Sequence, residues 1–176
     1  MGSSDAALAE QEFSPLARIR QGLRALVPAP AAVLPPRYAR HLPAGVAQAW
    51  ETLGAYDQRH LIAVAGELAA AGHSERVVLA GLLHDIGKAG RVSVVDRVAV
   101  VMLDRLSPKL RDRLASRPRP LPGLDGLHLL LGHAESGANL LAEAGMTEDV
   151  VWLVRNHERR PGSVSLRALQ TADHRH

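Results

Sequence analysis

The chain has 176 residues, of which 47% are hydrophobic and 3% aromatic, and its formal net charge at pH 7 is +3. These values predict one folded domain with a core of Leu, Val and Ala, and they exclude a disordered chain. The chain contains no Cys, which excludes disulfides, thiolate catalysis and zinc–thiolate sites, so any metal has to bind His and carboxylates. The few aromatic residues and the mild charge give no indication of a polynucleotide partner.

The N-terminus has neither a basic lead nor a long apolar run that would indicate a secretory signal. The most apolar stretch, residues 92–103, is interrupted by Asp96 and Arg97 and is too short to span a bilayer. We therefore expect a cytoplasmic protein with no membrane partner.

The first 40 residues are expected to form an N-terminal helical and proline-rich extension, and residues 41–176 the main domain. Within the extension, residues 15–26 predict a short helix, because four apolar residues share one face: Leu16, Ile19, Leu23 and Leu26. Four prolines then predict a stiff linker: Pro28, Pro30, Pro35 and Pro36.

Helical periodicity continues through the middle of the chain. Residues 44–54 predict one helix that ends at Gly54, and Asp57 is the expected N-cap of the next helix, which runs to residue 72. Ser74 is expected to cap a further helix, with Gly87 as its stop. Two more helices are predicted at about 94–106 and, beginning with a Ser-Pro pair, at about 107–115.

The C-terminal third predicts three helices. A long helix covers about residues 127–144, Thr147 caps a second helix, and Ser165 opens the last one after a break at Pro161-Gly162. No segment alternates in the manner of a strand, and no internal repeat is present. The pattern therefore predicts an all-α helical bundle.

Six polar side chains lie on, or at the end of, the apolar faces of five predicted helices. They are His60, His84, Asp85, His133, His157 and Asp173. A polar group on a core-facing stripe has to find a partner, and a divalent metal binds imidazole nitrogen and carboxylate oxygen together. Four imidazoles and two carboxylates suit two divalent ions, with Mn, Fe, Co, Mg and Zn all compatible with these ligands.

Each of these residues also has a simpler structural interpretation. A single His on an apolar face is more often a hydrogen-bonded core residue, and Asp173 would serve as a helix-end carboxylate near Arg175. The joint pattern favours the metal site, because polar residues placed by chance would not be expected to occur in this order and all on core-facing positions. The other five histidines are interpreted as surface residues: His41, His73, His128, His174 and His176.

The order His60, His84-Asp85 and Asp173 resembles the signature of the HD superfamily of metal-dependent phosphohydrolases, and the segment from His84 to Lys88 resembles its HDIG form. Residues 133–138 resemble the additional His segment of two-metal members. Residues 156–158 resemble their His-His-Glu segment, and residues 171–173 their final Ala-Asp. The resemblance covers about residues 55–175 and implies an HD-domain helical bundle.

The resemblance implies that His84 and Asp85 hold the metal centre, with Asp85 bridging two ions. His60 and Asp173 would complete one ion, and His133 and His157 the other. The resemblance also implies two catalytic residues, Asp85 and Lys88. Lys88, one helical turn beyond His84, would contact a phosphate oxygen or a metal-bound water. A solvated Lys at a helix C-terminus is the alternative. Arg159 and Arg160 are candidate substrate-binding residues for phosphate, with a solvated pair at a helix end as the alternative.

The sequence departs from the branch that hydrolyses cyclic di-GMP in three places. Asn156 replaces the first His of the His-His-Glu segment, and Tyr56 stands where that branch often has a Glu. Residues 159–163, Arg-Arg-Pro-Gly-Ser, follow the segment where that branch has Asp-Gly and then Gly-Tyr-Pro. These departures argue against a third metal and against cyclic-dinucleotide specificity.

The resulting expectation is a metal-dependent phosphomonoesterase or phosphodiesterase that acts on a small, nucleotide-like phosphorylated substrate. One alternative is a mixed-valent di-iron oxygenase of the same superfamily, which uses the same four His and two Asp. A second alternative is a regulatory HD domain that binds ligands or partners without turnover. The apolar face of residues 15–26 is expected to dock on the chain's own domain, with another subunit as the alternative.

Overall fold

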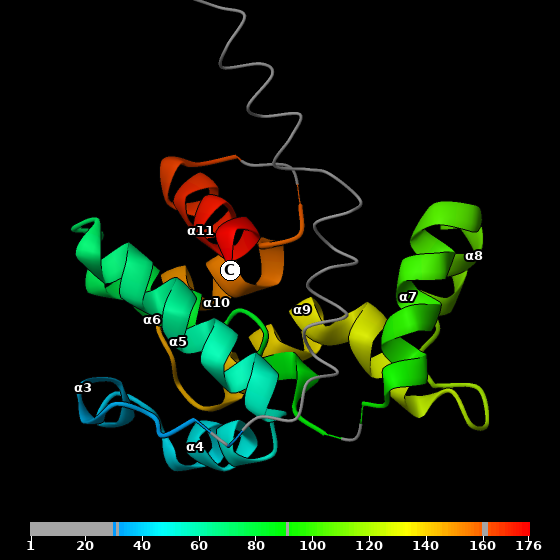
Figure 1. Cartoon of the computed structure of the whole chain (residues 1–176), viewed down its shortest axis with the longest axis horizontal. Coiled ribbons are helices and arrows are strands. Elements are labelled where there is room, and N and C mark those ends of the chain that lie inside the picture. The colour runs from blue at the N-terminus through cyan, green and yellow to red at the C-terminus, as the bar shows by residue number, and fades with distance from the viewer. Residues whose placement is uncertain (1–29, 31, 91, 160–161) are drawn as a thin grey trace, which may run out of the picture.

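The computed structural model describes residue 30 and residues 32–90, 92–159 and 162–176 (Figure 1). The helix predicted at residues 15–26, together with Arg160 and Pro161, lies outside these described residues. The domain boundary drawn at residue 40 therefore stays a prediction.

Across the described residues the chain is helical, with no β-strand, which confirms the all-α prediction. In chain order the elements are α3 (Pro36–Ala39), α4 (Ala44–Glu51), α5 (Ala55–Ala70), α6 (Glu75–Leu83), the 3₁₀ turn η1 (Ile86–Lys88), α7 (Val94–Leu106), α8 (Pro108–Ala115), α9 (Asp125–Glu143), α10 (Glu148–Asn156) and α11 (Val164–Arg175). No helix among them is long and apolar enough to cross a membrane.

The core surrounds α6, which packs against α5, α10 and α11 (Figure 1). Its side chains are almost all aliphatic, and the largest fully buried ones include Leu61, Leu82, Leu83, Leu141 and Leu169. Helix α9 packs against both η1 and α10, and so joins the turn after α6 to the C-terminal half of the bundle. The ends of α6 and α10 are thereby brought next to the middle of α9.

Helices α7 and α8 form a pair at one end of the molecule, joined to the rest through α9 (Figure 1). Ser93 is the N-cap of α7: its hydroxyl accepts a hydrogen bond from the Asp96 amide, while the Asp96 carboxylate accepts one from the Ser93 amide. This reciprocal capping box fixes the start of α7. The limits of α7 and α8 agree with the sequence prediction.

Several predicted helix limits were wrong. Asp57 is not an N-cap but lies in the first turn of α5, because Gly54 takes the cap position. Gly87 does not end α6, which stops at Leu83, and lies instead inside η1. Ser163 rather than Ser165 caps α11, since its hydroxyl accepts from the Leu166 amide.

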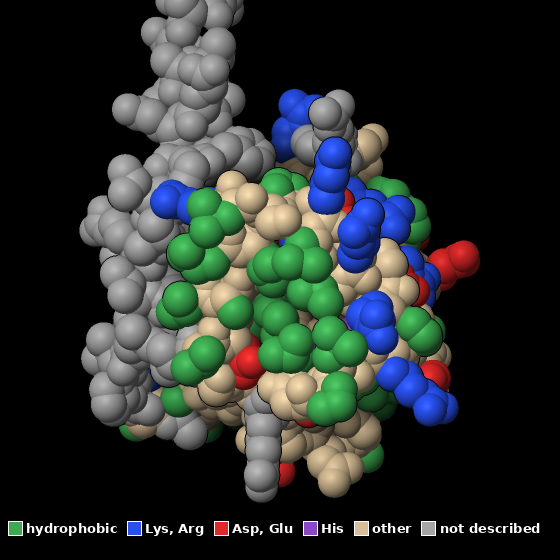
Figure 2. All heavy atoms as spheres, turned by 90° about the vertical axis from the view of Figure 1, so that its right-hand side faces the viewer, with side chains coloured by type: hydrophobic (Ala, Val, Ile, Leu, Met, Phe, Trp, Pro, Cys, Tyr) green, Lys and Arg blue, Asp and Glu red, His purple; other side chains and the backbone are tan. Residues whose placement is uncertain are grey.

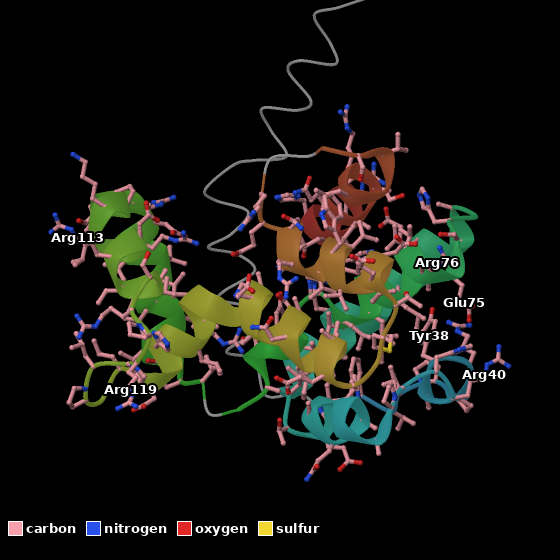
Figure 3. All side chains as sticks on the ribbon, turned by 180° about the vertical axis from the view of Figure 1, so that it is seen from behind. Tyr38, Arg40, Glu75, Arg76, Arg113 and Arg119 are labelled. Carbon is pink, nitrogen blue, oxygen red and sulfur yellow. The ribbon has the colours of Figure 1, made fainter. Side chains whose placement is uncertain are left out.

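The predicted proline linker was wrong at its C-terminal end, because Pro36 begins the short helix α3. Proline is well tolerated at the first helical position, where no intrahelical bond needs its amide. Tyr38 of α3 is buried in the core (Figure 3).

Candidate metal centre

The structure brings the six side chains singled out by the sequence into one place, in two groups of three. One group is His60, His84 and Asp173, and the other is Asp85, His133 and His157. Within each group the potential ligand atoms lie within 4.8 Å of one another. Five of the residues are buried, and the Asp173 side chain is 26% exposed.

Each ligand candidate occupies a helix end or a core-facing helix position. His84 is the C-cap residue of α6 and His157 that of α10, so both rings leave their helices where the backbone turns. His60 lies in the first half of α5, His133 in the middle of α9, and Asp173 near the end of α11. Five separate segments therefore contribute to the centre.

Three of the imidazoles are oriented by the same local hydrogen bond. The Nδ1 atoms of His84, His133 and His157 lie 2.9, 2.6 and 2.6 Å from the carbonyl oxygen three residues earlier in each case. A carbonyl only accepts, so each Nδ1 carries the proton and donates it. The Nε2 atom of each ring is then the one that faces the centre, as metal ligation requires.

His60 is held differently. Its Nε2 lies 2.9 Å from the Asp173 carboxylate, and its Nδ1 is buried without a hydrogen-bond partner among the described residues. The ring of Tyr56, one helical turn earlier, stacks nearly parallel on the His60 ring, with 6.5 Å between centroids. The position that departs from the cyclic-di-GMP branch therefore holds an aromatic ring against a ligand candidate.

The carboxylate of Asp85 lies between the two groups. Its Oδ1 is 3.1 Å from His133 Nε2 and 3.7 Å from His157 Nε2. Its Oδ2 is 3.7 Å from His84 Nε2 and 2.5 Å from Lys88 Nζ. The two oxygens of one carboxylate thus face different sets of nitrogens.

Two glycines allow this proximity. A Cβ on Gly87 would collide with the backbone carbonyl of His133 and the backbone nitrogen of Gly137, both on α9. A Cβ on Gly137 would in turn lie 3.0 Å from the Gly87 nitrogen. The absence of both side chains lets η1 lie directly on α9, which places the His-Asp doublet beside His133.

The protonation of the buried groups follows from their burial and mutual charges. Burial lowers the pKa of His84, but the Asp85 and Asp173 carboxylates outweigh it and raise this pKa to about 9. Burial and the charge of His84 lower the pKa of His157 to about 4. Burial opposes ionisation of Asp85 and Asp173, yet Lys88 beside Asp85 and His84 beside both carboxylates hold the two pKa values well below their usual range. The centre therefore contains buried ionised groups of both signs.

These residues fit a divalent cation. His133 Nε2 and His157 Nε2 face each other at 3.2 Å, with Asp85 Oδ1 beside them. When both imidazoles are neutral, these are three lone-pair atoms converging on one point, an arrangement that a cation stabilises. In the other group, His84 Nε2 is buried and lies 3.3 Å from Asp173 without forming a hydrogen bond. Nitrogen and carboxylate ligands without sulfur admit Zn, Mn, Fe, Co or Mg.

Lys88 lies beside the centre, in η1 rather than on a continued helix. Burial lowers its pKa, but the carboxylates of Asp85, Asp57 and Asp173 raise it above the usual value of Lys. Lys88 therefore remains a cation next to Asp85. Arg159 is exposed, and its backbone carbonyl accepts a hydrogen bond from the Gln170 amide. A phosphate-binding role for Arg159 and Arg160 stays a prediction.

Two polar contacts that support the centre were missed by the sequence reasoning. The buried carboxylate of Asp57 pairs with Arg97 of α7 at 2.7 Å. The buried amide of Gln170 donates to the carbonyls of His157 and Arg159, at 2.8 and 2.6 Å, and so holds the turn after α10. Asp57 precedes His60 by three residues, and Gln170 precedes Asp173 by three. This helical spacing from a ligand candidate was the signal that would have found them.

Comparisons with known proteins agree with this geometry. The HD domain family matches residues 57–176, which include all six ligand candidates. Searches of curated proteins and of solved structures found no match. The match spans more than half of the chain, so this protein belongs to the HD superfamily of metal-dependent phosphohydrolases.

Proposed function

We propose that this protein hydrolyses a phosphate ester of a small, nucleotide-like substrate at a centre that holds two divalent ions. The observation that carries the proposal is the position of the Asp85 carboxylate, because its Oδ1 faces His133 and His157 while its Oδ2 faces His84. A carboxylate so placed is suited to hold two ions close together. The class of substrate rests on the resemblance to the HD superfamily.

Each group of three side chains would hold one ion. His60, His84 and Asp173 supply two nitrogens and an oxygen, and so do Asp85, His133 and His157. Three protein ligands for one ion, and the second Asp85 oxygen in addition to three for the other, would leave positions open for water and substrate. Bound divalent ions supply Lewis-acid chemistry, which lowers the pKa of a water and offsets charge on the phosphoryl oxygens.

The protein's own cations complete the proposed site. Lys88 keeps its proton beside Asp85, and we assign it the binding of a phosphoryl oxygen, where its charge stabilises the negative charge of the transition state. Arg159 and Arg160 follow His157-Glu158 in the chain and would bind a more distant phosphate group. The Nδ1 hydrogen bonds of His84, His133 and His157 keep the ligand rings in place during turnover.

The test combines elemental analysis with hydrolysis of a panel of phosphate esters by the full chain. The panel contains p-nitrophenyl phosphate, bis-p-nitrophenyl phosphate and nucleoside mono-, di- and triphosphates. His133→Ala is compared with His128→Ala, which removes an imidazole from the same helix but outside the centre. We expect His133→Ala to lose metal and to reduce kcat/KM by at least about 100-fold, and His128→Ala to retain both.

Three results would contradict the proposal. Equal metal content and equal hydrolysis in the two variants would remove His133 from the centre. Bound iron with oxygen-dependent chemistry and no ester hydrolysis would favour the di-iron oxygenase. Metal well below one ion per chain with no turnover on any ester would favour a regulatory domain.

A further inference from the structure

The α7–α8 end of the molecule exposes an apolar stripe that no described residue covers. Four side chains of α7 form it at a spacing of three to four residues: Val95 (75% exposed), Val98 (53%), Met102 (48%) and Leu106 (74%). Leu110 of α8 continues it. Figure 2, which views the molecule from this side, shows apolar side chains gathered in the middle of the face and Lys and Arg mainly along its upper and right-hand edges.

These two helices bury little of their own surface. None of residues 95–106 is fully buried, and α8 contains no buried residue. Yet α7 has a well-formed capping box and an apolar stripe of the kind that normally packs against another helix. A contiguous exposed apolar stripe of this kind marks a surface that binds a partner.

We propose that the N-terminal segment of the same chain, residues 15–26, docks on this stripe of α7. The segment lies outside the described residues, and its sequence places Leu16, Ile19, Leu23 and Leu26 on one helical face. At about 1.5 Å per residue, the apolar stripes of the segment and of α7 have matching lengths of about 15 and 16 Å. The proposal does not depend on the function proposed for the metal centre.

The place where the described chain begins supports this occupant. The Pro30 carbonyl accepts a hydrogen bond from Arg59, and the Ala32 amide donates to Gln58, so the chain is fixed at the first turns of α5. Asp57, directly before these two residues, pairs with Arg97 near the start of α7. In the proposed arrangement the Leu26 end of the segment is therefore within reach of this end of α7, since the four steps from Leu26 to Pro30 span at most about 14 Å.

This anchoring point also sets the direction of docking. Leu26, the end of the segment nearer to Pro30, would lie beside the start of α7, and Leu16 beside Leu106. The segment would therefore run antiparallel to α7. In that register Leu23 lies opposite Val98, one helical turn from Met102, and Ile19 lies opposite Met102.

Charge supports the same arrangement. Residues 92–124 contain seven Lys and Arg side chains and three Asp, whereas the whole chain carries only +3. Residues 1–14 contain three acidic and no basic side chains. If the segment runs antiparallel to α7, these acidic side chains lie beyond Leu106, on the side of α8. Lys109 and Arg113 of α8 are exposed there. Arg113 and Arg119 extend from the outer edge of this end of the molecule (Figure 3).

Cross-linking tests the position of the segment directly, because the chain contains no Cys. The double variant Leu23→Cys with Met102→Cys is treated with a short bismaleimide and compared with Leu23→Cys with Arg40→Cys. Arg40 is exposed and lies at the opposite end of the molecule from Arg113 (Figure 3). It is also much closer to Leu23 along the chain, so a segment that is not docked would react more readily with position 40 than with position 102.

We expect efficient intramolecular cross-linking of positions 23 and 102 and little of positions 23 and 40. Preference for position 40, or equal reaction at both, would overturn the proposal. Cross-links between two chains would also overturn it, since they would assign the stripe of α7 to a second copy.

Hydrogen exchange provides the second measurement. Leu23→Asp places a charge on the apolar face of the segment, and Gln21→Asp places the same charge on the opposite face. If the segment covers α7, the amides of residues 94–106 exchange about tenfold faster in Leu23→Asp than in Gln21→Asp. Equal exchange in the two variants would contradict docking on α7, and because neither residue belongs to the described core, the comparison does not depend on a destabilised fold.

Discussion

The glycine of the HDIG segment gives the sharpest test of how the two halves of the centre are held together. A Cβ on Gly87 would meet the carbonyl of His133 and the nitrogen of Gly137. Both are backbone atoms of α9, and they cannot relieve the clash by a rotamer change as a flexible side chain can. Gly87→Ala therefore has to push η1, and with it the His-Asp doublet, away from α9.

The structure sets the size of the expected effect. Forcing an extra methyl group into a packed contact costs about 1–3 kcal/mol, and in a chain of this length each kcal/mol lowers Tm by about 2–4 °C. We therefore expect Gly87→Ala to lower Tm by between about 2 and about 12 °C. His133 and His157 would stay together on α9 and α10, while Asp85 would leave them. Metal affinity of that group should fall at least about tenfold, equivalent to about 1.4 kcal/mol.

Gly132→Ala is the matched control. Gly132 lies on the same helix as His133, and no atom outside its own helix lies within 4 Å of the position of its Cβ. Replacing a helical Gly by Ala stabilises by about 0.5–1 kcal/mol, so this variant should melt at the same temperature as the parent or higher. Thermal denaturation and metal titration of both variants make the comparison. If Gly87→Ala is as stable as Gly132→Ala and binds metal equally well, close contact of η1 with α9 does not build the centre.

Two further predictions concern charge. Because the pKa of His84 is raised to about 9, its protonation should stabilise the chelator-treated protein by about 3 kcal/mol below pH 6.5, and this contribution should be lost as pH rises from 6.5 to 9. Urea unfolding across that range measures it, and a flat profile would contradict the assignment. Asp57→Asn leaves the partly exposed Arg97 without its charged partner and should destabilise by about 1.5–3 kcal/mol, as expected for a hydrogen bond to a charged group. Asp149→Asn, which breaks the exposed pair with Arg76, should cost less than about 1 kcal/mol in the same urea assay.

Helix limits were predictable where capping and proline chemistry are local. The limits of α7 and α8 lie where the sequence predicts them, at about 94–106 and from the Ser-Pro pair at 107–108, and the structure adds the Ser93 capping box at the start of α7. The limits around α5 and α6 were not predictable in this way. Asp57 resembles an N-cap in sequence, but its carboxylate forms an ion pair with Arg97, forty residues later. Only the tertiary structure reveals that pair.

The six ligand candidates were predictable because each is a polar residue on, or at the end of, an apolar helix face. Burying such a group costs free energy unless it finds a polar or metal partner. Their division into two groups of three was implied only by the resemblance, and the structure shows that division in space. The residues around the centre were harder to predict from the sequence. Exposure of Arg159 and the contacts of Gln170 depend on how the turn after α10 packs against α11, which no local pattern encodes.

The hydrogen bonds of the imidazoles explain why so much of the centre could be found without a structure. In His84, His133 and His157, the ring is oriented by a carbonyl three residues earlier, so the direction of each Nε2 is a property of a single helical turn. The tertiary fold then has to supply only the separation of the turns, which Gly87 and Gly137 set. His60 has no such bond and depends on Asp173 and Tyr56 for its orientation. The group that contains His133 and His157 is therefore the more locally encoded of the two, and the group that contains His60 depends more on the assembled fold.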